Sequence, residues 1–216
     1  MRFLITAAAA ALMIAVAPQA VRADDENDID AVQYNDANIL SGISLEVKEI
    51  TGELSATSAS IANSFTAELG GSSDVDLEQK AIGNVTSSLD IVAKNFGGAV
   101  DLTAAAIANS ATITVEGGDY ADIDAVQRRS RDNNPKAEID FKGSGVGDVA
   151  ATAAAISNSL SVTTLPSTVV TEVNATQDNR AHIKAVANLD LKNTGGVDAT
   201  AAAIGNSLTV SNLLND

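Results

Sequence analysis

The sequence predicts an all-β protein, a β-solenoid of about four repeats of about 48 residues each. Landmark motifs recur along the chain at a constant period, and apolar and polar residues alternate between the landmarks with a period of two. The side chains are also small, since the 216 residues include no Trp, two Tyr and four Phe. Such side chains suit thin stacked layers better than a bulky globular core.

The repeat is defined by two landmarks. The first, Asp-Ile-Asp-Ala-Val-Gln at residues 28–33, recurs unchanged at 122–127 and in related form at 74–79 and 172–177, so its glutamines are 46, 48 and 50 residues apart. The second, Ile-x-Asn-Ser, begins at Ile61, Ile107, Ile156 and Ile204, in steps of 46, 49 and 48 residues. Two landmarks with one period predict a repeat domain over residues 24–216, with approximate repeats 28–72, 73–121, 122–171 and 172–216.

Alternation indicates that the first part of each repeat is β-strand with one buried face. In the fourth copy, apolar and amide side chains occupy every second position from Val173 to Leu191, and most positions between them are polar. The first copy repeats this pattern from Ile29 to Val47. A run of 19 residues exceeds the usual strand length, so we expect a bend within it. Glycine pairs at residues 97–98 and 195–196 predict the corner that follows.

The second part of each repeat fits two structures. Alternate positions in the last copy suit a strand: Ala202, Ile204, Asn206, Leu208 and Val210. Other positions fall at helical spacing, and alanine favours helix, so the alternative fold is α+β with the Ala-rich segments helical. Asn and Ser in mid-segment, and β-rich tails such as residues 113–115, favour the strand. The two halves of a repeat also resemble each other, which allows eight rungs of about 24 residues.

The first 23 residues have the features of a secretory signal peptide. Arg2 gives a positive start, residues 4–16 form an apolar stretch shorter than a membrane-spanning helix needs, and small or apolar residues precede Asp24. The alternatives, a retained anchor or a buried helix, are disfavoured because no stop-transfer flank follows. We expect cleavage after Ala23, export, no transmembrane span in the mature chain and, without a cysteine at the cleavage site, no lipid anchor.

Charge and cysteine content limit the partners. The net charge of −15 becomes −17 when Arg2 and Arg22 leave with the signal peptide. Such an acidic chain argues against nucleic acid or an anionic membrane surface as the main partner. The absence of cysteine means that no disulfide stabilises the exported chain, so burial, backbone pairing or assembly must do so.

Stacked repeats convert recurring amides into columns. We expect an inward glutamine column and an inward asparagine column, in which each amide satisfies the donors and acceptors of its neighbours. The residues are Gln33, Gln79, Gln127, Gln177, Asn63, Asn109, Asn158 and Asn206. The role is structural, and the alternative is that these amides cap turns at strand ends.

Outward carboxylates would also form a stripe. Its members are Asp28, Asp30, Asp74, Asp76, Asp122 and Asp124. Opposed like charges are destabilising unless water, salt or a cation screens them, and oxygen ligands suit calcium. The spacing matches neither an EF-hand nor a calcium-binding β-roll, so a solvated acidic face is favoured over a calcium site, and no cofactor is expected otherwise.

The residue inventory argues against an enzyme. The chain has one histidine, His182, on the polar parity, and its ordinary interpretation is an exposed strand residue. No metal-ligand spacing is present, and the paired carboxylates are products of the repeat. The third copy is interrupted by a basic stretch with Arg128, Arg129 and Arg131, which we expect to form a protruding loop. This loop is either an ordinary insertion or a contact for the acidic stripe of another subunit or an acidic polysaccharide.

The repeats resemble those of curlin-type subunits, whose Gln-x-Gly-x-Asn-x-Ala pattern is shortened here to Gln33-Tyr-Asn35-Asp-Ala37 and Gln177-Asp-Asn179-Arg-Ala181. The Ala-Ile-x-Asn-Ser signature is similar to that of the holdfast-anchoring proteins of stalked bacteria. This resemblance covers most of residues 28–214 and implies an exported, surface-bound, non-enzymatic protein. This sequence lacks the curlin glycine between Gln and Asn and has a longer period.

We therefore expect a structural or adhesion component of the bacterial cell surface, associated with the outer membrane, that adds β-strands at its end rungs. Its partner would be a copy of itself or another surface or outer-membrane protein. The alternative is a soluble periplasmic or extracellular binding module for carbohydrate or calcium.

Overall fold

The computed structural model describes residues 3–12, 26–48, 52–130, 134–165, 168 and 170–212. Over these residues the chain is all-β, with three parallel sheets and no helix. The predicted all-β class is confirmed, and the parallel sheets are consistent with the predicted β-solenoid. The alternative with helical Ala-rich segments is wrong for the described residues. Each Ala-rich segment is a long strand with paired strands beside it, and these backbone hydrogen bonds together with the buried face outweigh the modest helix propensity of alanine.

Each sheet collects equivalent strands from successive repeats. One sheet contains β2 (Glu26–Asn35), β5 (Ser72–Ala81), β8 (Tyr120–Arg129) and β11 (Val170–Asn179). A second contains β3 (Ile39–Lys48), β6 (Val85–Lys94), β9 (Pro135–Ser144) and β12 (Lys184–Lys192). The third contains β1 (Phe3–Leu12) and the long strands β4 (Gly52–Gly70), β7 (Val100–Glu116), β10 (Val149–Thr164) and β13 (Val197–Asn212).

The pairing register follows the sequence period. In the sheet of β2, Gln33 lies opposite Gln79, and Gln127 lies between Gln79 and Gln177. Paired strands are therefore 46 to 50 residues apart. The strands of one sheet do not stack at a spacing of 24 residues. Each turn of the chain uses two short strands and one long strand before it returns to the same sheet.

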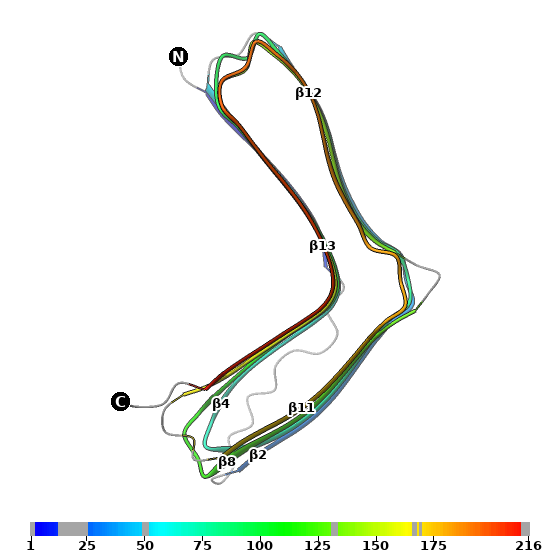
Figure 1. The fold of residues 1–216 in the computed structure, drawn as a ribbon, viewed down its shortest axis with the longest axis vertical. Helices are drawn as coiled ribbons and strands as arrows, with labels where there is room; N and C mark the ends of the chain where they lie inside the picture. The colour runs from blue at the N-terminus through cyan, green and yellow to red at the C-terminus, as the bar shows by residue number, and fades with distance from the viewer. Residues whose placement is uncertain are drawn as a thin grey trace.

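The stacked turns form an L-shaped coil with two arms (Figure 1). In one arm the β12 sheet faces the first halves of the long strands, and in the other the β11 sheet faces their second halves. Each arm has its own apolar core. The first includes Ile91, Phe96 and Phe141, and the second includes Ile113 and Ile123, all fully buried. Each such side chain contributes about 1.5–3 kcal/mol to stability through its burial.

The long strands bend where the arms meet, and their buried face changes parity there. Ala106 and Ala108 are buried, but so is Asn109, directly after Ala108, and burial then continues at Ala111 and Ile113. Register is continuous on both sides of this point. The single alternation expected from Ala202 to Val210 is therefore interrupted at the bend. The isoleucines of the landmark face outward, while the asparagines two residues later face inward.

The predicted bend in the first part of each repeat is confirmed at residues 36–38, between β2 and β3. Glycine occupies the corners before β7, β10 and β13, and at Gly98 the reason is steric. A Cβ atom at Gly98 would lie 1.4 Å from the carbonyl oxygen of Gly52, so neighbouring turns approach here with no room for a side chain.

Strand β1 lies within the residues predicted to be a signal peptide. In the full chain its backbone adds to the edge of the long-strand sheet, in parallel register with β4 from Gly52 to Ile61. The cleavage site after Ala23 lies outside the described residues, and the signal peptide stays a prediction. Removal of the leader would uncover this edge of β4.

Candidate functional site

The glutamines of the first landmark form a hydrogen-bonded column. The Nε2 atom of Gln79 donates to Oε1 of Gln33 at 2.7 Å, and that of Gln127 donates to Oε1 of Gln79 at 2.7 Å. Gln177 continues the column by donating to Gln127 at 2.8 Å. The first three side chains are at most 1% exposed. Each amide is thus a donor to the preceding strand and an acceptor from the following one, which leaves the interior of the column fully satisfied.

The same glutamines also join the two landmarks. The Nε2 atoms of Gln79 and Gln127 donate to the backbone carbonyls of Ser110 and Ser159 at 2.9 and 2.8 Å. These serines end the Ile-x-Asn-Ser landmark on the facing long strand. The contact explains why both landmarks keep one period, because each glutamine must meet the serine of its own turn.

The asparagines of the second landmark form a column that runs in the opposite direction. The Nδ2 atom of Asn63 donates to Oδ1 of Asn109, and Asn109 donates in the same way to Asn158, both at 2.8 Å. Asn158 donates to Asn206 at 2.8 Å. Asparagine donors therefore point toward the carboxyl-terminal end of the stack, whereas glutamine donors point toward the amino-terminal end. The two columns have opposed dipoles side by side at the corner of the L.

A third column lies at the turns and was missed from the sequence. The Oδ1 atom of Asn38 accepts from the backbone N–H of Asn84, and Oδ1 of Asn84 accepts from that of Asn134. The series ends at the backbone N–H of His182, which donates to Asn134 at 2.9 Å. The signal was present as an asparagine five residues after Gln33 and after Gln79. The exposed side chain of His182 thus lies in a turn, beside the end of this column, rather than within a strand.

The acidic residues lie in two in-register columns. Asp28, Asp74 and Asp122 occupy one and Asp30, Asp76 and Asp124 the other. Desolvation raises the pKa of Asp74 above its ordinary value, and the charges of Asp122, Asp76, Asp28 and Asp124 add to this effect. Within the described part of the chain, no group of three or more His, Cys, Asp and Glu is arranged to hold a metal ion. A calcium role for the stripe stays a prediction.

The basic residues of the third copy do not form the expected protruding loop at Arg128 and Arg129. Both belong to β8, where Arg128 is exposed and Arg129 is buried, 2% exposed. Arg131 lies outside the described residues. The prediction failed because charge was taken as a sign of a loop, whereas Arg129 continues the inward parity of Gln127. Together with Lys80, Ser130, Asp178 and Arg180, these two arginines line an open pocket of about 520 Å³.

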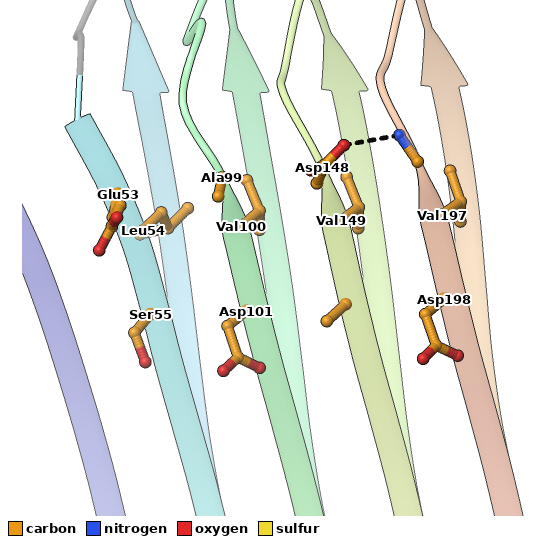
Figure 2. A pocket seen from close by; sticks show the side chains of 12 residues that line it. Glu53, Leu54, Ser55, Ala99, Val100, Asp101, Asp148, Val149, Val197 and Asp198 are labelled. Carbon is orange, nitrogen blue, oxygen red and sulfur yellow. Dashed lines mark hydrogen bonds between the residues drawn. The ribbon is translucent and has the colours of Figure 1, made fainter.

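A second hollow of about 490 Å³ crosses the starts of the long strands (Figure 2). Leu54, Val100 and Val149 form its apolar part, and acids stand among them. Asp148 is held by the backbone N–H of Gly196, which donates to its Oδ1 at 2.7 Å. Asp101 and Asp198 are in register two strands apart, so their backbones are about 10 Å apart. Residues this far apart are poorly placed to share one metal ion, and the lining contributes no histidine or lysine as a proton carrier.

A known protein family matches most of this chain. The family model of holdfast attachment protein D matches residues 6–216. No curated protein and no solved structure matches the chain. Among the described residues no helix is long and apolar enough to cross a membrane. The match supports the holdfast part of the resemblance drawn from the sequence, whereas the curlin part stays a prediction.

Proposed function

We propose that this chain, which belongs to the holdfast attachment protein D family, is a non-enzymatic attachment subunit of the cell surface that adds to further copies end to end. The observation that carries the proposal is the open carboxyl-terminal end of the stack. Leu208 and Val210 are 50% and 47% exposed, whereas Leu160 and Val162, at the same register positions one strand earlier, are 1% and 0% exposed. A further turn of the same kind would bury them.

The backbone offers the same opportunity. Among the described strands, β11, β12 and β13 each lie at the edge of their sheet, so three parallel edges lie on one side of the stack. Exposed strand edges carry backbone N–H and C=O groups that another strand can pair with. Addition of a whole turn would supply affinity through main-chain hydrogen bonds and specificity through side-chain register.

The two amide columns give this addition a direction. At the carboxyl-terminal end, the next bond of the asparagine column would be donated by Asn206 Nδ2. At the other end, the Oδ1 atom of Asn63 is buried and has no hydrogen-bond partner among the described residues. Head-to-tail contact places the donor of one copy at the vacant acceptor of the next, whereas tail-to-tail contact opposes two donors. Such heterologous contact builds an open filament rather than a closed dimer.

Export would control when this contact forms. In the full chain β1 occupies the edge of β4, which is the edge that β13 of another copy would join. Both strands contain a run of alanines, Ala7–Ala11 in β1 and Ala201–Ala203 in β13. Cleavage after Ala23 would release β1 and open this edge, so assembly, into a fibre of the curlin kind, follows export in this proposal.

The test uses a matched pair of lysine variants in the mature chain, residues 24–216. Leu208→Lys places a charge on the inward face of the open end, and Thr209→Lys places the same charge on the outward face one residue later. We expect wild type and Thr209→Lys to assemble with rising concentration in sedimentation velocity, and Leu208→Lys to stay monomeric. A wild-type chain that stays monomeric at high concentration, or two variants that assemble alike, would contradict the proposal.

A further inference from the structure

The open pocket of about 520 Å³ is positively charged, although the chain as a whole is acidic. Its lining contains four cationic side chains, Lys80, Arg128, Arg129 and Arg180, and one anionic side chain, Asp178, on a chain whose net charge is −15. The pocket lies where β5, β8 and β11 end. Its volume falls within the range of small-ligand sites, about 300–1,000 Å³.

Arg129 lies on the inward side of this pocket. It occupies the position of Asn179 in the next strand and Ala81 in the preceding one, so an arginine stands where the other copies have a small or neutral residue. Its Nη2 atom donates to the carbonyl of Gly83 at 2.6 Å. Burial lowers the pKa of Arg129 to about 10, which still leaves the guanidinium charged at neutral pH. Arg129 therefore contributes a positive charge to the lining of the pocket.

On the outer side of the pocket, two positively charged side chains lie next to each other on neighbouring strands. Lys80 and Arg128 are direct neighbours in the parallel register, an arrangement that is unfavourable by itself. Arg128 is held by Glu78 at 3.0 Å, and the Lys80 ammonium lies 5.4 Å from the centre of the Tyr34 ring. Arg180 reaches Asp178 at 2.9 Å. Among the described lining residues, four side chains are cationic and one, Asp178, is anionic.

We propose that this pocket binds the carboxylate groups of an acidic polysaccharide. Arginine presents a planar fork of donors that matches a carboxylate, and three arginines line the pocket. Ser130 also lines the pocket and carries a hydroxyl that suits a sugar hydroxyl, and the ring of Tyr34, 55% exposed, offers an apolar face beside Lys80. The pocket is open, as a site for a unit within a polymer must be.

A second copy of the chain fits this pocket less well. End-to-end addition in register would place Tyr34 of the added copy next to Asp178, so the acidic stripe of that copy would continue the stripe of this one and would not meet the pocket. If copies stack as proposed above, the pocket recurs once per copy, about 19 Å apart for four strand spacings. Recurring sites strengthen the binding of a polymer through multivalency. This last step rests on the proposed assembly, whereas binding to one pocket does not.

The experiment measures one pocket at a time in the non-assembling background of Leu208→Lys. Calorimetric titration of the mature chain with a short oligogalacturonate should show saturable binding, and a neutral dextran oligosaccharide should show none. Arg180→Gln should weaken binding about tenfold or more, which corresponds to the loss of one charge-assisted hydrogen bond. Lys48→Gln is the matched control, because Lys48 is similarly exposed and bonded to one acid, Glu46 at 2.8 Å, far along the chain from the pocket.

Three results would overturn the proposal. Arg180→Gln and Lys48→Gln could weaken binding equally, which would mean that overall charge and not the pocket attracts the sugar. Dextran could bind as tightly as oligogalacturonate, or inorganic phosphate could compete fully at equal concentration of charge, and either result would refute recognition of an acidic sugar. Lys80→Gln repeats the test should Arg180→Gln unfold, as judged by its melting curve. Failure of end-to-end assembly leaves all of these measurements unchanged, so the two proposals fail separately.

Discussion

Replacement of Gln79 by leucine tests whether the glutamine column stabilises the stack. Gln79 donates to Gln33 and to the Ser110 carbonyl and accepts from Gln127, and its side chain is fully buried. Leucine has nearly the same volume but no polar group, so the variant removes one hydrogen bond from each of three buried polar groups. At about 1–2 kcal/mol for each group, the expected loss is about 3–6 kcal/mol in the free energy of unfolding.

The matched variant is Gln177→Leu at the open end of the same column. Gln177 donates to Gln127 and to the Ser207 carbonyl, and its side chain is only partly buried, so water can replace the lost bonds. We expect a loss of about 1–2 kcal/mol there. Urea denaturation of the mature Leu208→Lys chain, followed by circular dichroism, measures both losses without assembly. Equal losses for Gln79→Leu and Gln177→Leu, or a loss below about 1 kcal/mol for Gln79→Leu, would refute a buried cooperative column and favour local capping of turns.

Two further predictions follow from the acidic stripe and the glycine corner. Asp74→Asn should raise the free energy of unfolding at pH 7 by about 0.5 kcal/mol, as for surface charges, because the raised pKa of Asp74 means that its ionised form is disfavoured in the folded state. This gain in stability should shrink as the pH falls through that raised pKa. It should vanish below about pH 3.9, where aspartate is protonated in the unfolded chain as well. Thermal melts of both proteins across a range of pH measure the effect. Gly98→Ala should cost more than about 3 kcal/mol through a backbone clash, whereas Gly97→Ala, with open space and a φ of 69°, should cost about 1 kcal/mol of left-handed strain. Equal melting temperatures for these two variants would contradict the close approach at the corner.

The fold class could be predicted from the sequence because repetition and alternation are both local signals. Gln33 and its equivalents mark the period, and the alternation from Val173 to Leu191 marks strands with one buried face. The parity change between Ala108 and Asn109 could not be predicted in the same way. It follows from the bend of a long strand between two separate cores, which is a tertiary constraint that no single segment of the sequence records.

The candidate sites also differ in how far the sequence predicts them. Residues at one motif position, such as the landmark asparagines, were readily grouped, since stacking at a constant period aligns equivalent positions. The basic pocket was found only in part. Lys80 and Arg128 share one motif position, directly after the landmark glutamine, but Arg180 lies beyond the end of β11, so the three side chains meet only through register and turn geometry. Arg129 was misplaced because its burial depends on space that the neighbouring copies leave by having Ala81 and Asn179 at that position.

Head-to-tail addition of copies can be measured directly by cross-linking, because the chain contains no cysteine. Ser64 and Ser207 are equivalent positions in the first and last long strands, linked through the register of Ser110 and Ser159. In an added turn their Cα atoms would be about 4.8 Å apart, within the range that a disulfide spans. Mature Ser64→Cys and Ser207→Cys chains, mixed and mildly oxidised, should give a mixed disulfide dimer, and neither chain alone should cross-link efficiently. Cross-linking of Ser207→Cys to itself at equal yield, or no mixed dimer while the chains assemble, would contradict the account.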